Sequence, residues 1–179
     1  MSNDWAFEAD GHFAEQFPLS PLDDHLIHQT PDPIRIAATT DPRFFERHWN
    51  VFHDQKGDLL IATGGSFYPN LDTAEAFAIV TCRGVQRSVR AFRRIGANRG
   101  NIHVGPVQPT IVSGMREWRH VLAENDHGIR YDLTWEDTHR QMYRAAYGSL
   151  DDGGQRHVTA GFESFGRVGF WVEIEGERI

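Results

Sequence analysis

Three polar side chains at alternate positions of the chain are the first candidates for chemistry. Glu46, His48 and Asn50 would share one face of a strand, because successive side chains of a strand point to opposite sides. If that face lines a cavity, burial raises the pKa of Glu46 and makes it a proton donor near neutral pH. The alternative is an ion pair between Glu46 and an arginine near the strand end. The spacing makes Glu46 a candidate catalytic residue, and His48 and Asn50 candidate ligand-binding residues.

A second candidate catalytic residue, His120, belongs to an expected hairpin with one aromatic face. Pairing residues 116–122 with residues 129–136 puts four pairs on that face: Leu122 with Ile129, His120 with Tyr131, Trp118 with Leu133, and Arg116 with Trp135. The other face matches opposite charges, as in Arg119 and Asp132, which is typical of a half-buried antiparallel pair. His120 is then either a proton donor or a hydrogen-bonded histidine of the core.

Aromatic residues complete the expected ligand site. An aromatic wall would contact an apolar ligand and can stabilise a passing cation, and its expected members are Trp49, Trp118, Tyr131 and Trp135. The glycine-containing segment 64–70 is predicted to be a loop between two strand pairs. Its aromatic pair, Phe67 and Tyr68, could cap the mouth of a barrel, and Tyr68 and Asn70 are its candidate ligand-binding residues. The alternative is a long turn without a binding role.

Metal and cofactor motifs are absent from the sequence. It has no nucleophile elbow, phosphate-binding loop, zinc-protease or Cys-x-x-Cys pattern. His48 and His53 fall on opposite faces of one expected strand, so they do not converge on an ion. We expect no metal and no cofactor. Cys82 fits a small buried hydrophobe better than a nucleophile.

The length and net charge of the chain exclude several classes of function. A chain of 179 residues is long enough for one compact core, and its net charge of −7 argues against binding duplex nucleic acid. No apolar run approaches the ~20 residues that a membrane helix needs. A single cysteine excludes an internal disulfide, and the start of the chain has no secretory pattern. We expect a cytoplasmic protein without a nucleic-acid partner or a membrane span.

The chain divides into a proline-rich strap and one β domain. Residues 1–42 hold five of the eight prolines and are predicted to lie over the scaffold, with a short helical turn near residues 13–17. The alternative for the strap is a frayed tail. In residues 43–179 only the segment 138–147 could be a short helix. The expected strands are residues 44–53, 58–63, 74–82, 85–94, 101–104, 107–112, 116–122, 129–136, 157–165 and 168–174, the last two forming a hairpin.

These strands predict an all-β, antiparallel fold. No segment of helix length separates them, so parallel pairing is disfavoured. About nine strands in one open sheet would accumulate twist and expose two edges. Closure into a barrel or half-barrel around a small ligand is therefore expected, and a sandwich is the competing architecture.

Short motifs carry a family resemblance over roughly residues 40–179. They are FERHWNVFHD at residues 45–54, Tyr-Pro-Asn at 68–70, GFESFGR at 161–167 and Trp-Val-Glu at 171–173. They resemble the N-terminal half of the double lipocalin-like family of hydroxyneurosporene synthase (carotenoid 1,2-hydratase) and kievitone hydratase. The matching positions are Glu46, His53, Asp54, Pro69 and Asn70. The chain departs from the pattern at Arg47, at Asn50, which comes one place early, and at Tyr68.

The resemblance implies a lipocalin-like domain that takes up an isoprenoid, steroid or polyketide-like molecule. A second half, which family members usually have, does not follow residue 179 in this sequence. Three functions stay open. The first is a cofactor-independent hydratase, isomerase or cyclase that uses acid–base chemistry, and the second is a non-catalytic carrier of an apolar ligand. The third is a scaffold that assembles with a second copy or with a second lipocalin-like domain.

Overall fold

The computed structural model describes residues 21–26, 36–150 and 156–179. Single 3-10 turns at Pro21–Asp24 and Pro69–Leu71 are the helical segments within these ranges. All other regular elements are strands, and every strand pairing is antiparallel, which confirms the expected fold class. The strands are β1 (Glu46–His53), β2 (Leu59–Tyr68), β3 (Thr73–Cys82), β4 (Val85–Arg94), β5 (Val107–Ser113), β6 (Glu117–Leu122), β7 (Ile129–Asp137), β8 (Met142–Leu150), β9 (Arg156–Glu163), β10 (Gly166–Ile174) and β11 (Glu177–Arg178).

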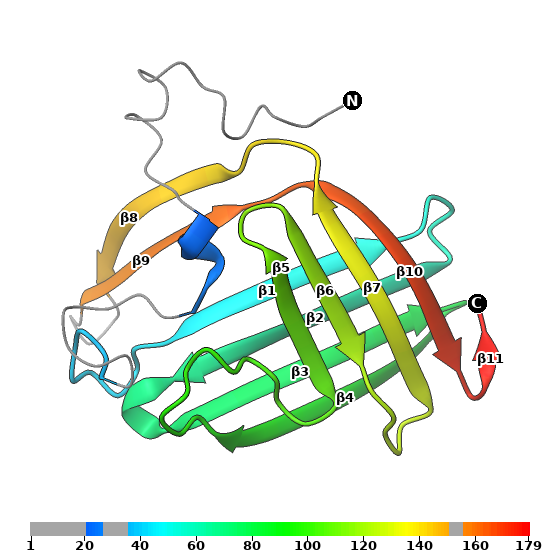
Figure 1. The fold of residues 1–179 in the computed structure, drawn as a ribbon, viewed down its shortest axis with the longest axis horizontal. Helices are drawn as coiled ribbons and strands as arrows, with labels where there is room; N and C mark the ends of the chain where they lie inside the picture. The colour runs from blue at the N-terminus through cyan, green and yellow to red at the C-terminus, as the bar shows by residue number, and fades with distance from the viewer. Residues whose placement is uncertain (1–20, 27–35, 151–155) are drawn as a thin grey trace.

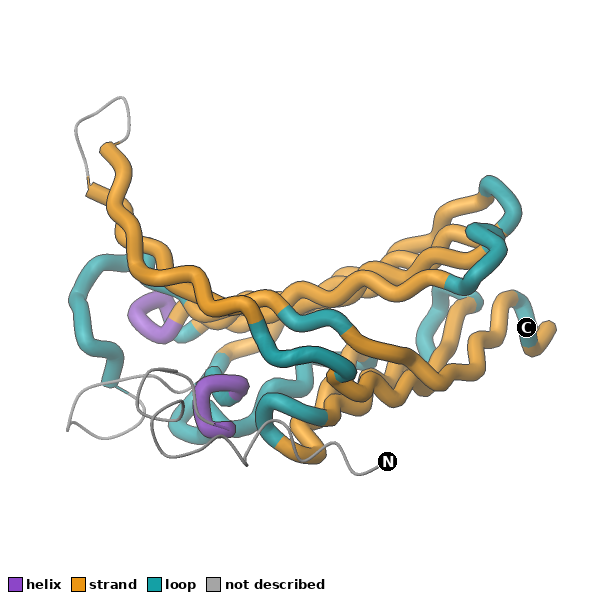
Figure 2. The backbone as a smooth tube through the Cα atoms, turned by 90° about the horizontal axis from the view of Figure 1, so that it is seen from above, coloured by secondary structure: helices purple, strands orange, loops and turns teal. Residues whose placement is uncertain are grey.

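The strands form two main sheets and a separate hairpin. The first sheet has the order β1-β2-β3-β4, the second has the order β11-β10-β7-β6-β5, and β8 pairs with β9. The second sheet crosses the first obliquely, and the two lie in separate layers (Figures 1 and 2). Among the described residues no pairing joins β1 to β10 or β4 to β5. Of the barrel or half-barrel that we expected, the closed barrel is therefore not formed.

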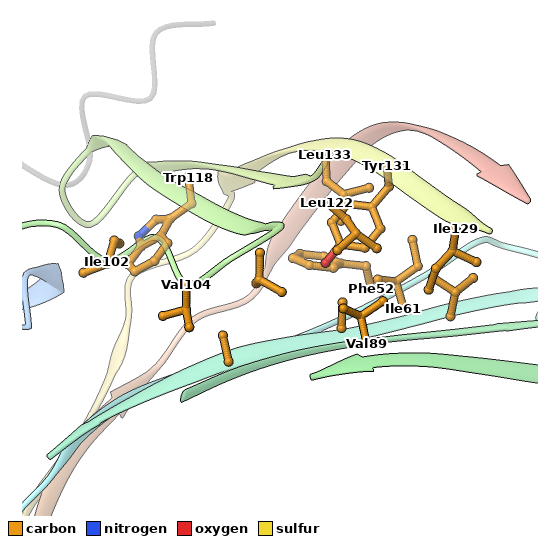
Figure 3. Close-up of a cluster of buried hydrophobic side chains, with 14 of the residues drawn as sticks. Phe52, Ile61, Val89, Ile102, Val104, Trp118, Leu122, Ile129, Tyr131 and Leu133 are labelled. Atoms are coloured by element: carbon orange, nitrogen blue, oxygen red, sulfur yellow. The ribbon is translucent and has the colours of Figure 1, made fainter. Parts of the chain in front are cut away.

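The hydrophobic core lies between the two sheets, because alternate residues of each strand point inward. On β3 the buried positions are Ala74, Ala76, Ala78 and Val80, which let the second sheet approach closely. Phe52 and Ile61 of the first sheet point toward Tyr131 and Leu133 of the second (Figure 3). Burial of these apolar surfaces is the main force that holds the layers together.

The first sheet is a simple meander, and its tight turns follow the sequence pattern. Arg83 and Gly84 have φ values of 49° and 79°, as the two-residue turn between β3 and β4 requires. The predicted strands 74–82 and 85–94 are accordingly confirmed to within one residue.

Two segments take a different structure from the one expected. The segment 64–70 is mostly strand rather than loop, because β2 continues to Tyr68. A side chain at Gly64 would collide with the ring of Phe77, which packs over it from β3. The segment 138–147 is not a helix, since Met142–Leu150 is strand β8 and pairs with β9. Within this segment the paired residues are far apart in the chain: Tyr147 pairs with Thr159 and Met142 with Glu163, beyond the reach of local propensity.

The expected hairpin of residues 157–165 and 168–174 is also wrong. β9 pairs with β8, whereas β10 pairs with β7. Gly166 does not make a turn; it opens β10 opposite Asp137, so close to the Glu136 carbonyl that any side chain would collide with it. Its small size serves the contact with β7.

The β6–β7 hairpin has the predicted faces but a register shifted by two residues. The observed pairs are Leu122 with Tyr131, His120 with Leu133 and Trp118 with Trp135. A shift of two keeps every side chain on its own face, because the side-chain period of a strand is two. Arg119 still reaches Asp132, now on the diagonal, with 2.6 Å between Nη2 and Oδ2.

Most of the predicted strap, including its turn near residues 13–17, lies outside the described residues. The described turn Pro21–Asp24 packs against Gly114, where a side chain would collide with the Pro21 carbonyl, and it buries Asp24. In the ranges that the structure describes, no helix has the length and apolar character needed to cross a membrane.

Candidate functional site

The inner face of β1 carries the polar residues that the alternation predicted. Glu46, His48 and Asn50 lie on the same side as the buried Phe52. Trp49 lies on the opposite, outer face and is 67% exposed. Its expected place in the aromatic wall is therefore wrong, because the same alternation that turns His48 inward turns Trp49 outward.

A pair of histidines meets between the sheets. The ring centroids of His48 on β1 and His120 on β6 are 6.2 Å apart. Trp118 contacts both rings, at 5.3 Å from His48 and 5.6 Å from His120, and it stacks on His120 with 13° between the planes. Phe52 approaches His120 from the first sheet at 5.3 Å and also contacts Trp135 at 5.8 Å. Tertiary packing thus brings together most of the residues proposed for the ligand site.

Both histidines are neutral at physiological pH. Burial lowers the pKa of His48 to about 4, and burial together with the nearby His48 lowers the pKa of His120 to about 3. The Asn50 amide donates a hydrogen bond to His48 Nδ1 at 3.1 Å, so the proton of the neutral ring is on Nε2. At neutral pH these rings are hydrogen-bonding groups, and His120 does not carry the extra proton that its predicted role as donor needs.

Two polar atoms of this site have no hydrogen-bond partner within the described part of the chain. They are His120 Nε2 and the hydroxyl of Tyr131, and both side chains are almost completely buried. Thr63 approaches the Tyr131 hydroxyl from β2, outside hydrogen-bond geometry, and donates its own proton to the Phe77 carbonyl at 3.0 Å. Burial raises the pKa of Tyr131 to about 12, so its hydroxyl keeps its proton. The site therefore offers unsatisfied polar groups inside an aromatic enclosure.

Glu46 does not join this group. Its carboxylate forms an ion pair with Arg99, with 2.5 Å between Oε2 and Nη2; the Arg99 side chain is buried and that of Glu46 is mostly buried. Arg99 Nη2 also lies 3.4 Å from the Leu26 carbonyl. The ion pair left open by the sequence is thus present. Nothing in the sequence singled out Arg99, because it lies 53 positions from Glu46 in an irregular segment.

Two buried carboxylates support the tryptophans of the wall. Asp137 accepts a hydrogen bond from Trp135 Nε1 and one from Gln141 Nε2, both at 2.8 Å. Asp24 accepts from the Met115 amide and from Trp118. Burial raises the pKa of both carboxyls, and the charge of Asp24 raises that of Asp137 further. Sequence reasoning missed both residues, although Asp137 stands two places after Trp135 on one strand face.

The chain belongs to a family of unknown function, DUF8625, whose model matches residues 19–179. No curated protein and no solved structure matches the chain.

The remaining predicted ligand residues of this DUF8625 protein lie outside the histidine site. Tyr68 is on the outer face of the first sheet, where its hydroxyl donates to Glu75 Oε1 at 3.1 Å. Asn70 follows β2, and its amide donates to the carbonyls of Thr39 and Asp41 at 2.7 and 2.9 Å. Both predictions of a ligand-binding role rested on a loop, whereas β2 continues to Tyr68 and Asn70 lies in the 3-10 turn that follows. Asn70 instead stabilises the segment before β1 through these two hydrogen bonds.

The protein has a wide hollow on its surface and a narrow crevice between its sheets. A surface hollow of about 540 Å³ lies beside the loop 123–128 and opens widely to solvent. A narrow apolar crevice, with no room for a water molecule, lies between the two sheets next to Phe52 and Leu133. Within the described ranges, no group of three or more His, Cys, Asp or Glu side chains could hold a metal ion.

Proposed function

We propose that this DUF8625 protein binds a small apolar molecule between its two sheets and holds one polar group of that molecule. The observation that carries the proposal is the pair of unsatisfied buried atoms, His120 Nε2 and the Tyr131 hydroxyl. Buried polar groups in native proteins nearly always have partners, and leaving one unmet costs about 1–3 kcal/mol. An occupant that hydrogen-bonds to both atoms would remove this cost.

The walls of the site favour an apolar body for the occupant. Trp118, Phe52 and Trp135 line it, and the neutral histidines present flat ring faces. Such aromatic surfaces gain from contact with rings and conjugated chains. The lipocalin-like resemblance supports the same class of ligand, an isoprenoid, steroid or polyketide-like molecule.

Native mass spectrometry of the protein from its own host tests this proposal. We expect a bound molecule that survives purification and that is lost in a Trp118→Leu variant. Trp49→Leu is the matched control, because Trp49 lies on the exposed outer face. Added ligand at about 100 times its Kd should stabilise the fold by about 2.7 kcal/mol. A consistently empty protein, unshifted in melting temperature by a panel of apolar alcohols and ketones, would refute binding.

Acid–base catalysis is the second candidate function. The observation that favours it is the pair Asp24 and Asp137, whose raised pKa values bring carboxylic acids closer to neutrality beside the indoles of the site. A protonated carboxyl there could start hydration, isomerisation or cyclisation of a bound alkene. The test is to incubate the identified ligand in deuterated water and follow its mass. Incorporation of deuterium that disappears in Asp137→Asn supports catalysis, and an unchanged ligand leaves a binding protein.

A further inference from the structure

We infer that the site selects uncharged molecules with a hydroxyl or carbonyl group and admits them past Phe52, through the crevice between β1 and β10. This inference rests on the proposed function and adds to it the class of ligand and its route. It follows from the lining of the crevice, from the position of Phe52 and from the charges around the site.

The crevice opens on a side where the two sheets are not joined. It is lined by Phe52, His53, Leu59, Ile61, Leu133 and Phe170. Within the described strands, β1 and β10 share no ladder of hydrogen bonds. The layers can therefore part along this seam without breaking a backbone hydrogen bond. Phe170, which is 40% exposed, stands at its outer rim.

Phe52 separates this crevice from the polar atoms. Its ring contacts His120 at 5.3 Å on one side, and the same side chain forms part of the crevice wall on the other. Leu133, a second wall residue, is the direct cross-strand partner of His120. Figure 3 shows Phe52 between the first sheet and Tyr131. A rotation of this one ring would connect the crevice to His120 Nε2 and the Tyr131 hydroxyl.

The groups around the site predict which ligands it accepts. Asn50, the two histidines and Tyr131 are neutral and offer hydrogen bonds only. Arg99, the buried cation among the residues that the structure describes, pairs with Glu46. The carboxyl groups of Asp24 and Asp137 lie behind the tryptophans and offer an incoming anion no positive charge. A carboxylate in this enclosure would lose its water without meeting a free cation, which is strongly unfavourable, whereas an alcohol would gain hydrogen bonds.

Three probes with one carbon skeleton test this selection. Toluene, benzyl alcohol and benzoate share seven carbons, and saturation-transfer NMR measures their binding to the full chain at neutral pH. We expect benzyl alcohol to bind about fivefold more tightly than toluene, which corresponds to one net hydrogen bond. Benzoate should bind at least about tenfold more weakly than benzyl alcohol. In Tyr131→Phe the affinity for benzyl alcohol should fall toward that for toluene.

A second set of variants tests the route. Phe52→Ala should speed association of both toluene and benzyl alcohol and keep their order of affinity. Phe52→Leu serves the same purpose if the alanine variant does not fold. Phe92→Ala is the matched control, because Phe92 is 65% exposed on the outer face of β4. It should leave the association rates unchanged.

The outcomes separate the inference from the proposed function. If benzoate binds as tightly as benzyl alcohol, the inferred selection is wrong while a binding site remains. If changes at Phe52 and Phe92 have equal effects, the inferred route is wrong. If none of the three probes binds to the wild type or to the Phe52 variants, both the inference and the proposed function fail.

Discussion

Trp118 and Trp135 lie directly opposite each other on β6 and β7, and a different buried carboxylate holds each indole. Asp137 comes from the end of the same strand as Trp135, whereas Asp24 comes from the turn that precedes the sheets. Trp118 in turn contacts both histidines. The aromatic wall is therefore positioned by buried carboxyl groups that lie outside it.

The buried carboxyl of Asp137 should make the fold more stable in acid than at neutral pH, relative to a variant that lacks this carboxyl. Its folded-state pKa lies above the ordinary aspartate value of 3.8, so its contribution to stability is complete below that value and is lost as pH rises through the folded pKa. Between about pH 7 and about pH 4, acidification should stabilise the wild type relative to Asp137→Asn. Urea unfolding at each pH measures this difference.

Asp132 supplies a control of opposite sign. The ion pair with Arg119 lowers its pKa, so its contribution to stability is lost as pH falls. The wild type should therefore lose stability on acidification relative to Asp132→Asn. If acidification changed the stability of the wild type in the same direction relative to both variants, the different environments that the structure shows for the two carboxyls would be contradicted.

The ion pair of Glu46 and Arg99 should be structural. Removing one member of a buried pair leaves the other charge uncompensated, so Glu46→Ala is expected to cost about 3–5 kcal/mol of unfolding free energy. A double variant, Glu46→Leu with Arg99→Met, should recover much of that loss. Chemical denaturation checks both values. A stable Glu46→Ala protein would revive the expectation that this carboxylate is free for catalysis.

The two interior histidines should stay neutral through the physiological range. Burial holds the pKa of His48 near 4 and that of His120 near 3, so neither ring should titrate between about pH 5 and about pH 8. Two-dimensional proton–nitrogen NMR of the imidazoles would show this. The His48 ring should also show protonation at Nε2, as the hydrogen bond from Asn50 requires. A midpoint near 6.5 for either ring would mean that water reaches it freely.

Two glycines of β10 should differ sharply in their tolerance of a methyl group. A Cβ at Gly166 would collide with the backbone of Glu136, whereas a Cβ at Gly169 would meet no atom within 4 Å. Gly166→Ala should cost about 1–3 kcal/mol, as overpacking does, and Gly169→Ala should change stability little. Thermal or urea unfolding compares the two. Equal effects would argue against the close pairing of β10 with β7.

The alternation of polar and apolar residues along the chain predicted a large part of the fold and of the site. A period of two in polarity was enough to identify most strands and to place His48, Asn50, Trp118 and His120 on inner faces. It did not determine the register of β6 and β7, because a shift of two residues preserves every face. The connecting loop helps to set the register of a hairpin, and Asn125 braces the loop 123–128 by donating to the carbonyls of Ala123 and Ile129.

Contacts between distant segments could not be read from the chain. The choice of β7 as the partner of β10, the salt bridge of Glu46 with Arg99 and the contact of Asp24 with Trp118 each join residues many positions apart. The amino-acid sequence determined which side chains point inward, because that depends on neighbouring residues alone. The tertiary structure decided which inward side chains meet, because that depends on how two separate sheets pack across a shared core.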